Sequence, residues 1–158
     1  MTTVDVDVEA SAWTDAVPDA EDVVDRAVQT AMTYADPPPE AANVTVLLAD
    51  DAAVAALNEQ FRGKDGPTNV LSFPSPANPE GHLGDLALAY ETCAREAEAQ
   101  GKPLAAHLTH LVAHGVLHLL GFDHQDDAEA EAMETIERAA LAQLGLPDPY
   151  AGEDRAHA

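Results

Sequence analysis

Three histidines with the spacing His-x3-His-x5-His constrain this chain more than any other feature. They are His114, His118 and His124, and they follow a helical pattern that begins at Pro103, a residue tolerated in the first turn of a helix. In such a helix His114 and His118 lie one turn apart on the same face, with Cβ atoms roughly 5–6 Å apart. Gly121 can end the helix in a left-handed conformation, so that the reversed chain brings His124 back towards the pair.

This spacing predicts a metal site. Three imidazole nitrogens leave the fourth tetrahedral position of a Zn²⁺ ion open for water, as in catalytic zinc sites, and we expect one ion per chain. The spacing is that of the zinc-protease pattern H-E-x-x-H-x-x-G-x-x-H, but Gly115 stands in place of the glutamate that serves as general base. We therefore expect this pattern to bind a metal but not to hydrolyse peptides by the protease mechanism.

Two further histidines share the same helix. His110 lies one turn before His114, so a His110/His114 pair is an alternative ligand set, although it leaves no partner at the required spacing downstream. His107 is off the pattern, and we expect it to be structural or solvent-facing.

The histidine segment, His114-Gly-Val-Leu-His118-Leu-Leu-Gly121-Phe-Asp123-His124, closely resembles the signature of the YbeY family of bacterial endoribonucleases that mature ribosomal RNA. The likeness covers about residues 44 to 146. It is also carried by Asn58-Glu-Gln-Phe-Arg62, Thr68-Asn69-Val70-Leu71-Ser72-Phe73-Pro74, Leu83-Gly84-Asp85, and Met133-Glu134 through Leu144-Gly145. The chain departs from the family's commonest form at Asn69, where that form has aspartate.

The resemblance implies a function and a set of partners. It implies a single-strand-specific, zinc-dependent endoribonuclease that acts in 16S rRNA 3′-end maturation and in ribosome quality control. The expected partners are single-stranded RNA and rRNA, together with the small ribosomal subunit or its assembly factors, but neither DNA nor a membrane. It also implies a mostly parallel four-stranded sheet with a zincin-like histidine helix at its centre.

Further site residues follow from the resemblance. Arg62 would contact the scissile phosphate through its guanidinium group, and Lys64 would help to bind the substrate. Asp85 would lie near the zinc as a general base or as a support for a ligand. Asp123 is expected either to orient a histidine ligand by a hydrogen bond or to cap the turn. Without the glutamate, three possibilities stay open for the missing base. They are a metal-bound hydroxide, Asp85, and a reaction in which the RNA's own 2′-hydroxyl attacks in cis.

The charge balance limits how the chain can bind RNA. Twenty-nine acidic residues face seven basic ones, a net charge of −22, whereas nucleic-acid affinity comes mostly from lysine and arginine. Only Arg62 and Lys64 form a close pair of cations in the sequence. RNA binding is therefore expected to be local and salt-sensitive, helped by the charge of the metal or by a partner that delivers the substrate.

Hydrophobic periodicity predicts a single α+β domain over residues 1–146, followed by a flexible acidic tail over 147–158. Period-2 alternation predicts a half-buried strand at 4–8, and the apolar run at 44–48 predicts a strand that is buried on both faces. Strands are also expected at 69–73 and 83–89, with about five helices. Trp13 is expected in the core beneath the first strand, and the lone Cys93 as a small buried residue.

The first twelve residues carry three acidic side chains and no basic one, and no apolar run reaches about 18 residues. We therefore expect a cytoplasmic protein without a secretory signal or a membrane span. Two alternative functions remain at this stage. One is a zinc hydrolase of another bond, such as a peptide bond, and the other is a metal-stabilised ribosome-assembly factor whose acidic surface docks on basic ribosomal proteins.

Overall fold

A computed structural model of the chain describes residues 2–35, 42–62, 68–75, 81–121 and 127–146. The described chain contains four strands and six helices. The strands are β1 (Thr2–Val8), β2 (Ala42–Ala49), β3 (Val70–Pro74) and β4 (His82–Ala89). The helices are α1 (Ala12–Ala16), α2 (Ala20–Met32), α3 (Asp51–Arg62), α4 (Tyr90–Ala99), α5 (Leu104–Leu119) and α6 (Asp127–Gln143).

The strands form one mixed sheet with the order β1-β2-β4-β3. β1 pairs with β2 and β2 pairs with β4 in parallel, whereas β3 pairs with β4 in antiparallel orientation at the edge. The prediction of a four-stranded, mostly parallel sheet in an α+β domain is confirmed.

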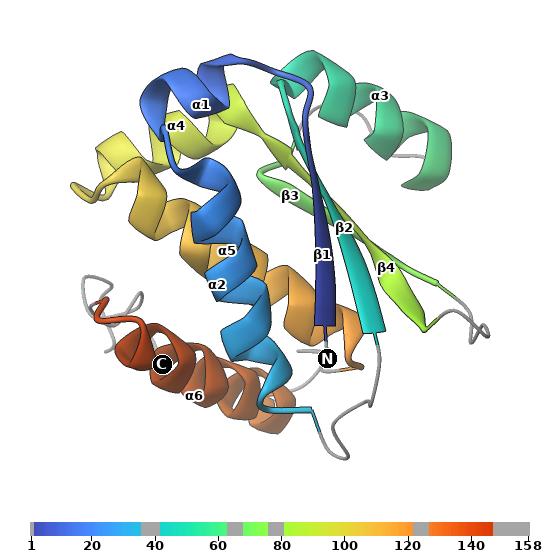
Figure 1. Cartoon of the computed structure of the whole chain (residues 1–158), viewed down its shortest axis with the longest axis vertical. Helices are drawn as coiled ribbons and strands as arrows, with labels where there is room; N and C mark the ends of the chain where they lie inside the picture. Colours follow the sequence, from blue (N-terminus) through green and yellow to red (C-terminus); the bar gives the residue numbers. More distant parts are fainter. Residues whose placement is uncertain (1, 36–41, 63–67, 76–80, 122–126, 147–158) are drawn as a thin grey trace.

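The two faces of the sheet are covered unequally (Figure 1). On one face, side chains from β1, β2 and β4 pack with α2, α5 and α6 in the main hydrophobic core. On the other face, α3 places Val54 against a smaller cluster that includes Ala87 of β4. Successive side chains of a strand point to opposite faces, so Leu86 joins the first core and Ala87 the second.

The histidine helix α5 is central, as expected, since it contacts α2, α4, α6, β3 and β4. Gly121 has a φ of 102° and its N–H bonds to the carbonyl of His118. The expected left-handed end of this helix is therefore confirmed. None of the helices in the described ranges is long and apolar enough to cross a membrane.

Two local expectations need correction. β2 is not buried on both faces, because its residues alternate between buried and half-buried along most of its length. Trp13 is fully buried as expected, but it lies in the additional short helix α1, where its Nε1 donates a hydrogen bond to the carbonyl of Ala49 at 2.9 Å. The expected tail at 147–158 lies outside the described residues.

Candidate active site

Two of the three predicted metal ligands face each other on α5. The Nε2 atoms of His114 and His118 are 3.0 Å apart, and the centroids of the two rings are 4.6 Å apart. His114 is 25% exposed and His118 is half-buried, so both rings remain within reach of solvent. The predicted one-turn spacing therefore brings the Nε2 atoms of two imidazoles close together in the C-terminal part of the helix.

A carboxylate from α6 supports this pair. Glu137 is 1% exposed, and its Oε1 lies 3.0 Å from Nδ1 of His114 and 2.8 Å from Nε2 of His110. Burial would raise the pKa of this carboxyl group, but the hydrogen bonds from His110 and His114 outweigh burial and lower its pKa to about 2. Glu137 is therefore an ionised acceptor for both histidines at neutral pH.

The arrangement of His114 and His118 fits a zinc ion. Two nitrogens each about 2.0–2.1 Å from one tetrahedral ion lie roughly 3.3–3.4 Å apart, close to the 3.0 Å seen here. Metal-bound histidines also commonly donate their second N–H to a carboxylate, as His114 does to Glu137. Within the described ranges no group of three or more His, Cys, Asp or Glu side chains is placed to hold a metal, and the predicted third ligand, His124, lies outside them, as does Asp123.

The structure gives a steric reason for the missing glutamate of the protease pattern. Gly115 packs against β4, and a Cβ atom at this position would lie 2.7 Å from Cδ2 of Leu86. Leu86 is itself fully buried, so it has little room to move. A glutamate at this position would therefore need Leu86 to shift within the core, which gives the absence of the protease base a packing cause.

Asp85 is not brought together with the histidines. Successive side chains of a strand point to opposite faces. The side chain of Leu86 packs on α5, so the side chain of Asp85 points to the other face of β4, the one that α3 covers. Its carboxylate is half-exposed and lies 3.1 Å from Nε2 of His82. The side chain thus points away from α5, and the expected position near the zinc stays a prediction. Arg62 ends α3, but its side chain and the whole of Lys64 lie outside what the structure describes.

Asp85 lines a cavity of about 420 Å³ on the α3 side of the sheet. The cavity has an apolar floor that includes Leu57 of α3 and Phe73 of β3, and it carries the carboxylates of Asp7 and Asp85. None of the described lining residues is a lysine or arginine. Because carboxylates repel phosphate, this cavity is a poor place for an RNA backbone.

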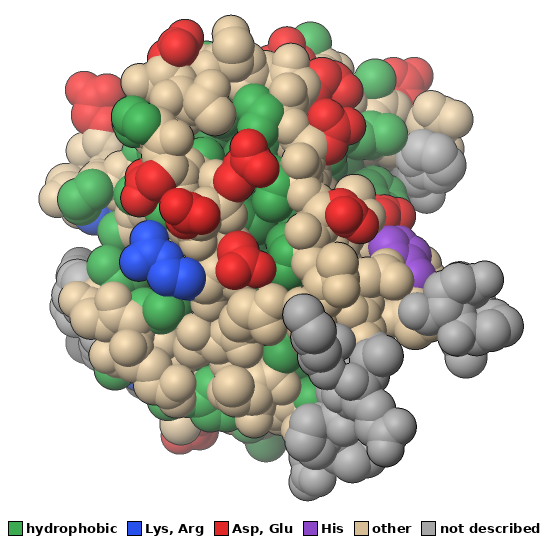
Figure 2. Space-filling model, in the orientation of Figure 1, with side chains coloured by type: hydrophobic (Ala, Val, Ile, Leu, Met, Phe, Trp, Pro, Cys, Tyr) green, Lys and Arg blue, Asp and Glu red, His purple; other side chains and the backbone are tan. Residues whose placement is uncertain are grey.

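The visible surface agrees with the net charge of −22. Figure 2 shows carboxylate side chains spread widely over the face that carries β1 and α2, with cationic side chains confined to a small part of it. The described side chains of this face form no broad cationic groove.

The sequence comparisons identify the family of the chain. A family model described as Endoribonuclease YbeY matches residues 7–145. A relative from Bradyrhizobium sp. (strain BTAi1 / ATCC BAA-1182), named Endoribonuclease YbeY, is 50% identical over 97% of this chain and 95% of its own length. Another with the same name, from Paramagnetospirillum magneticum, is 52% identical over 92% of this chain and 93% of its own. The chain belongs to the YbeY family.

A solved structure supports the fold. The solution structure of TM1509 from Thermotoga maritima covers 96% of this chain and 96% of its own, with a TM-score of 0.56 and 20% sequence identity. At this identity the likeness concerns the fold alone.

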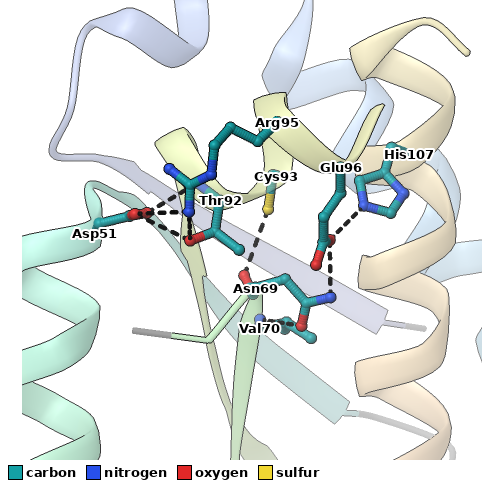
Figure 3. Close-up of polar contacts among 8 residues, drawn as sticks. All are labelled: Asp51, Asn69, Val70, Thr92, Cys93, Arg95, Glu96 and His107. Carbon is teal, nitrogen blue, oxygen red and sulfur yellow. Dashed lines mark hydrogen bonds and ion pairs between the residues drawn. The ribbon is translucent and has the colours of Figure 1, made fainter. Parts of the chain in front are cut away.

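The position at which this YbeY chain departs from the expected aspartate has its own polar partners (Figure 3). Asn69 donates from Nδ2 to Oε1 of Glu96 at 3.0 Å, and its Oδ1 accepts the N–H of Val70 at 2.7 Å. The same oxygen of Glu96 lies 2.8 Å from Nε2 of His107. Asn69 thus ties the start of β3 to α4 and, through Glu96, to α5. His107 is 3% exposed, so the structural one of its two expected roles is confirmed.

Cys93 belongs to the same cluster. Its thiol is fully buried and donates to the carbonyl of Asn69 at 3.4 Å. Burial raises the pKa of this thiol to about 12, with the neighbouring Glu96 adding to the effect. The expected role as a small buried residue is confirmed, since a thiol with this pKa is not a nucleophile at neutral pH.

Sequence reasoning missed Glu137 as part of the YbeY site. The buried residues of α6 include Met133 and Ala140, and Glu137 lies between them on the same buried face. A carboxylate on an apolar helical stripe is costly to bury without donors, so its position was the available signal.

Proposed function

We propose that this chain is a zinc-dependent endoribonuclease that cleaves single-stranded RNA and acts in 16S rRNA 3′-end maturation and ribosome quality control. Membership of a family whose curated relatives are named endoribonucleases supports an RNA substrate. The observation that supports zinc dependence is that the Nε2 atoms of His114 and His118 face each other, while Glu137 accepts a hydrogen bond from His114. We further propose a cytoplasmic protein that works with the small ribosomal subunit or its assembly factors.

The zinc ligands in this proposal are His114, His118 and His124. When bound, zinc would polarise a phosphoryl oxygen and lower the pKa of water at the open position. The Nε2 atoms of His114 and His118 face each other and would both bind the ion. On the far side of the His114 ring, Glu137 accepts a hydrogen bond from Nδ1. Asp123 is proposed to orient a ligand in the same way.

Substrate binding is proposed to use Arg62 and Lys64. A guanidinium group can hold a phosphate bidentately and offset charge that develops on its oxygens during cleavage. The net charge of −22 leaves few other cations for this role, since the chain has seven in all.

We propose a reaction in which Asp85 is not the base, because its side chain points to the α3-facing side of the sheet. The nucleophile would then be either water at the metal or the 2′-hydroxyl of the RNA. If the RNA 2′-hydroxyl attacks, the products carry 2′,3′-cyclic phosphate ends, and a single 2′-deoxy substitution at the cleaved position blocks the reaction. If water attacks, the deoxy substrate is still cut. An Asp85→Asn variant that loses activity while it keeps its fold would restore Asp85 as a base.

The direct test is cleavage of a labelled single-stranded RNA by zinc-loaded protein, beside a casein substrate. Wild type should cut the RNA and leave casein intact, and His114→Ala should lose cleavage because one ligand is gone. His157→Ala, which removes a histidine that we do not expect to be a ligand, is the matched control and should keep full activity. Intact RNA with cleaved casein would contradict the nuclease proposal in favour of a peptidase.

A second candidate is a metal-stabilised assembly factor with little catalysis, which the strongly acidic surface favours (Figure 2). A folded His114→Ala protein that cuts no RNA and still supports rRNA maturation in cells would make this the better description.

A further inference from the structure

Glu137 is an unusual residue for the interior of this protein. It is 1% exposed on α6, which packs against the histidine helix α5 (Figure 1). A carboxylate buried to this extent is costly unless hydrogen-bond donors compensate it. The donors come from His110 and His114, at 2.8 and 3.0 Å from one oxygen, Oε1. A buried charge thus lies directly behind one of the two facing histidines.

This contact decides where His114 carries its proton. One oxygen of Glu137 meets ring nitrogens of both His110 and His114, and a carboxylate oxygen shared in this way accepts from both, so Nδ1 of His114 is the donor. A neutral imidazole has one protonated nitrogen, which leaves Nε2 with its lone pair exposed. That Nε2 is the atom that faces His118 at 3.0 Å. The carboxylate therefore selects the form of His114 whose Nε2 lone pair points to the space shared with His118.

We propose that Glu137 is a positioning residue for the metal site, which holds the proton of His114 on Nδ1 and so directs the Nε2 lone pair at the ion. The inference rests on the proposed zinc site and deepens it. His110 has a supporting part, because it donates to the same oxygen and so restricts the orientation of the carboxylate. This places His110 behind the site rather than among the ligands.

The alternative role for Glu137 is purely structural. In that case its two hydrogen bonds only hold α6 against α5, and any folded variant should bind metal as well as wild type. A positioning role instead predicts changes in the His114 tautomer and in zinc affinity while the fold is kept. Second hydrogen-bond partners of metal ligands typically affect metal affinity by about 10- to 100-fold.

The test compares Glu137→Gln with a matched control, Glu131→Gln, which makes the same change at an exposed position of the same helix. Zinc dissociation constants are measured by competition with a chromophoric chelator, after circular dichroism has shown that each protein is folded. Glu137→Gln should bind zinc about 10- to 100-fold more weakly than wild type, whereas Glu131→Gln should match wild type.

The second measurement uses metal-free wild-type protein and needs no variant. Nitrogen-15 NMR of the histidine rings at pH 8 should show His114 protonated on Nδ1 and unprotonated on Nε2. In Glu137→Gln, which has lost the ionised acceptor, the share of this form should fall. If wild-type His114 carries its proton on Nε2, the inference is wrong, even if the variant fails to fold.

The outcomes separate the inference from the function on which it rests. Tight zinc binding by wild type together with equal affinity in Glu137→Gln would overturn the positioning role and leave the zinc site intact. Failure of wild type to bind zinc at all would instead contradict the proposed metal centre itself.

Discussion

At the scale of single residues, His114 and His118 face each other on α5, and Glu137 of α6 contacts one of them. Helical spacing alone places His114 and His118 on one face, because residues four apart lie one turn apart. Glu137 comes from a helix 23 residues away in sequence from His114, and only the packing of α6 on α5 brings it there. For Asp85 the likeness in sequence did not say to which face of β4 the side chain points, and the structure directs it away from α5.

Asn69 is a residue whose replacement by the family's common aspartate should be costly in this chain. Asn69→Asp replaces the donor that faces Glu96 with a second carboxylate. We expect the free energy of unfolding at neutral pH to fall by about 1–3 kcal/mol, the cost of an unsatisfied buried polar group. Urea unfolding monitored by circular dichroism measures this change.

The same substitution in a Glu96→Gln background is the control. The glutamine can donate an amide N–H to the new carboxylate and still accept from His107. The double variant should therefore lose clearly less stability than the single Asn69→Asp variant. Equal losses in both backgrounds would show that Glu96 is not the cause.

His107 should make stability depend on pH. Burial lowers its pKa from the ordinary value of 6.5, with Lys102 and His110 acting in the same direction and Glu96 opposing them. Below about pH 6.5 the unfolded chain therefore binds a proton that the folded protein excludes. The contribution of this residue is complete above pH 6.5 and is lost as the pH falls towards the lower folded pKa.

A comparison of wild type with His107→Gln isolates this effect. Glutamine keeps an N–H donor for Glu96 but does not titrate. Between pH 7.5 and 5.5 the wild type should lose more unfolding free energy than the variant. Parallel pH profiles of the two proteins in urea unfolding would contradict the assignment.

At the scale of elements, periodicity located the four strands and five of the six helices. It did not find α1, whose five residues are too short for a periodic pattern. It also did not determine the pairing order β1-β2-β4-β3, because strand order depends on contacts between distant segments. The order came from the family resemblance only in outline, as a mostly parallel sheet.

The first turns of α3 and α4 cap each other, a contact that the sequence alone does not predict. Asp50 caps α3, with its Oδ1 2.8 Å from the N–H of Ala53. Asp51, the first residue of α3, accepts the N–H of Thr92 in the first turn of α4 at 2.9 Å. Glu91 of α4 in turn accepts the N–H of Asp51 at 2.7 Å. Each helix start is thus capped by a carboxylate of the other.

The close approach of α5 to β4 gives a prediction for Gly115. Gly115→Ala gains about 1 kcal/mol of helix propensity, but its Cβ would meet Leu86 at 2.7 Å in the core. Overpacking of this kind costs about 1–3 kcal/mol, so we expect a net loss of stability. Thermal and urea unfolding measure it.

A Leu86→Ala background tests whether that contact is the cause. With the leucine shortened, Gly115→Ala should become neutral or stabilising, so that the two changes show a favourable coupling in a double-mutant cycle. If Gly115→Ala costs the same free energy in both backgrounds, the contact with Leu86 does not explain the glycine.

At the scale of the whole molecule, the charge of −22 leaves few cations to contact phosphates, so the affinity for RNA should fall with salt concentration less steeply than that of a broad cationic surface. For single strands the slope of log K against log salt is about −0.7 for each phosphate contacted, so contacts from Arg62 and Lys64 alone give about −1.4. Arg62→Ala should reduce the slope to about −0.7. Fluorescence anisotropy with a labelled single-stranded RNA between 50 and 200 mM salt measures it, and a wild-type slope near −5 would indicate a broad cationic surface instead.

Zinc content of the purified protein tests the central claim most directly. Elemental analysis at neutral pH, after metal loading and removal of excess ion, should give about one zinc per chain for wild type and almost none for His114→Ala or His118→Ala. His157→Ala should keep the wild-type content. Wild-type protein that is folded and holds no zinc after loading would contradict the account.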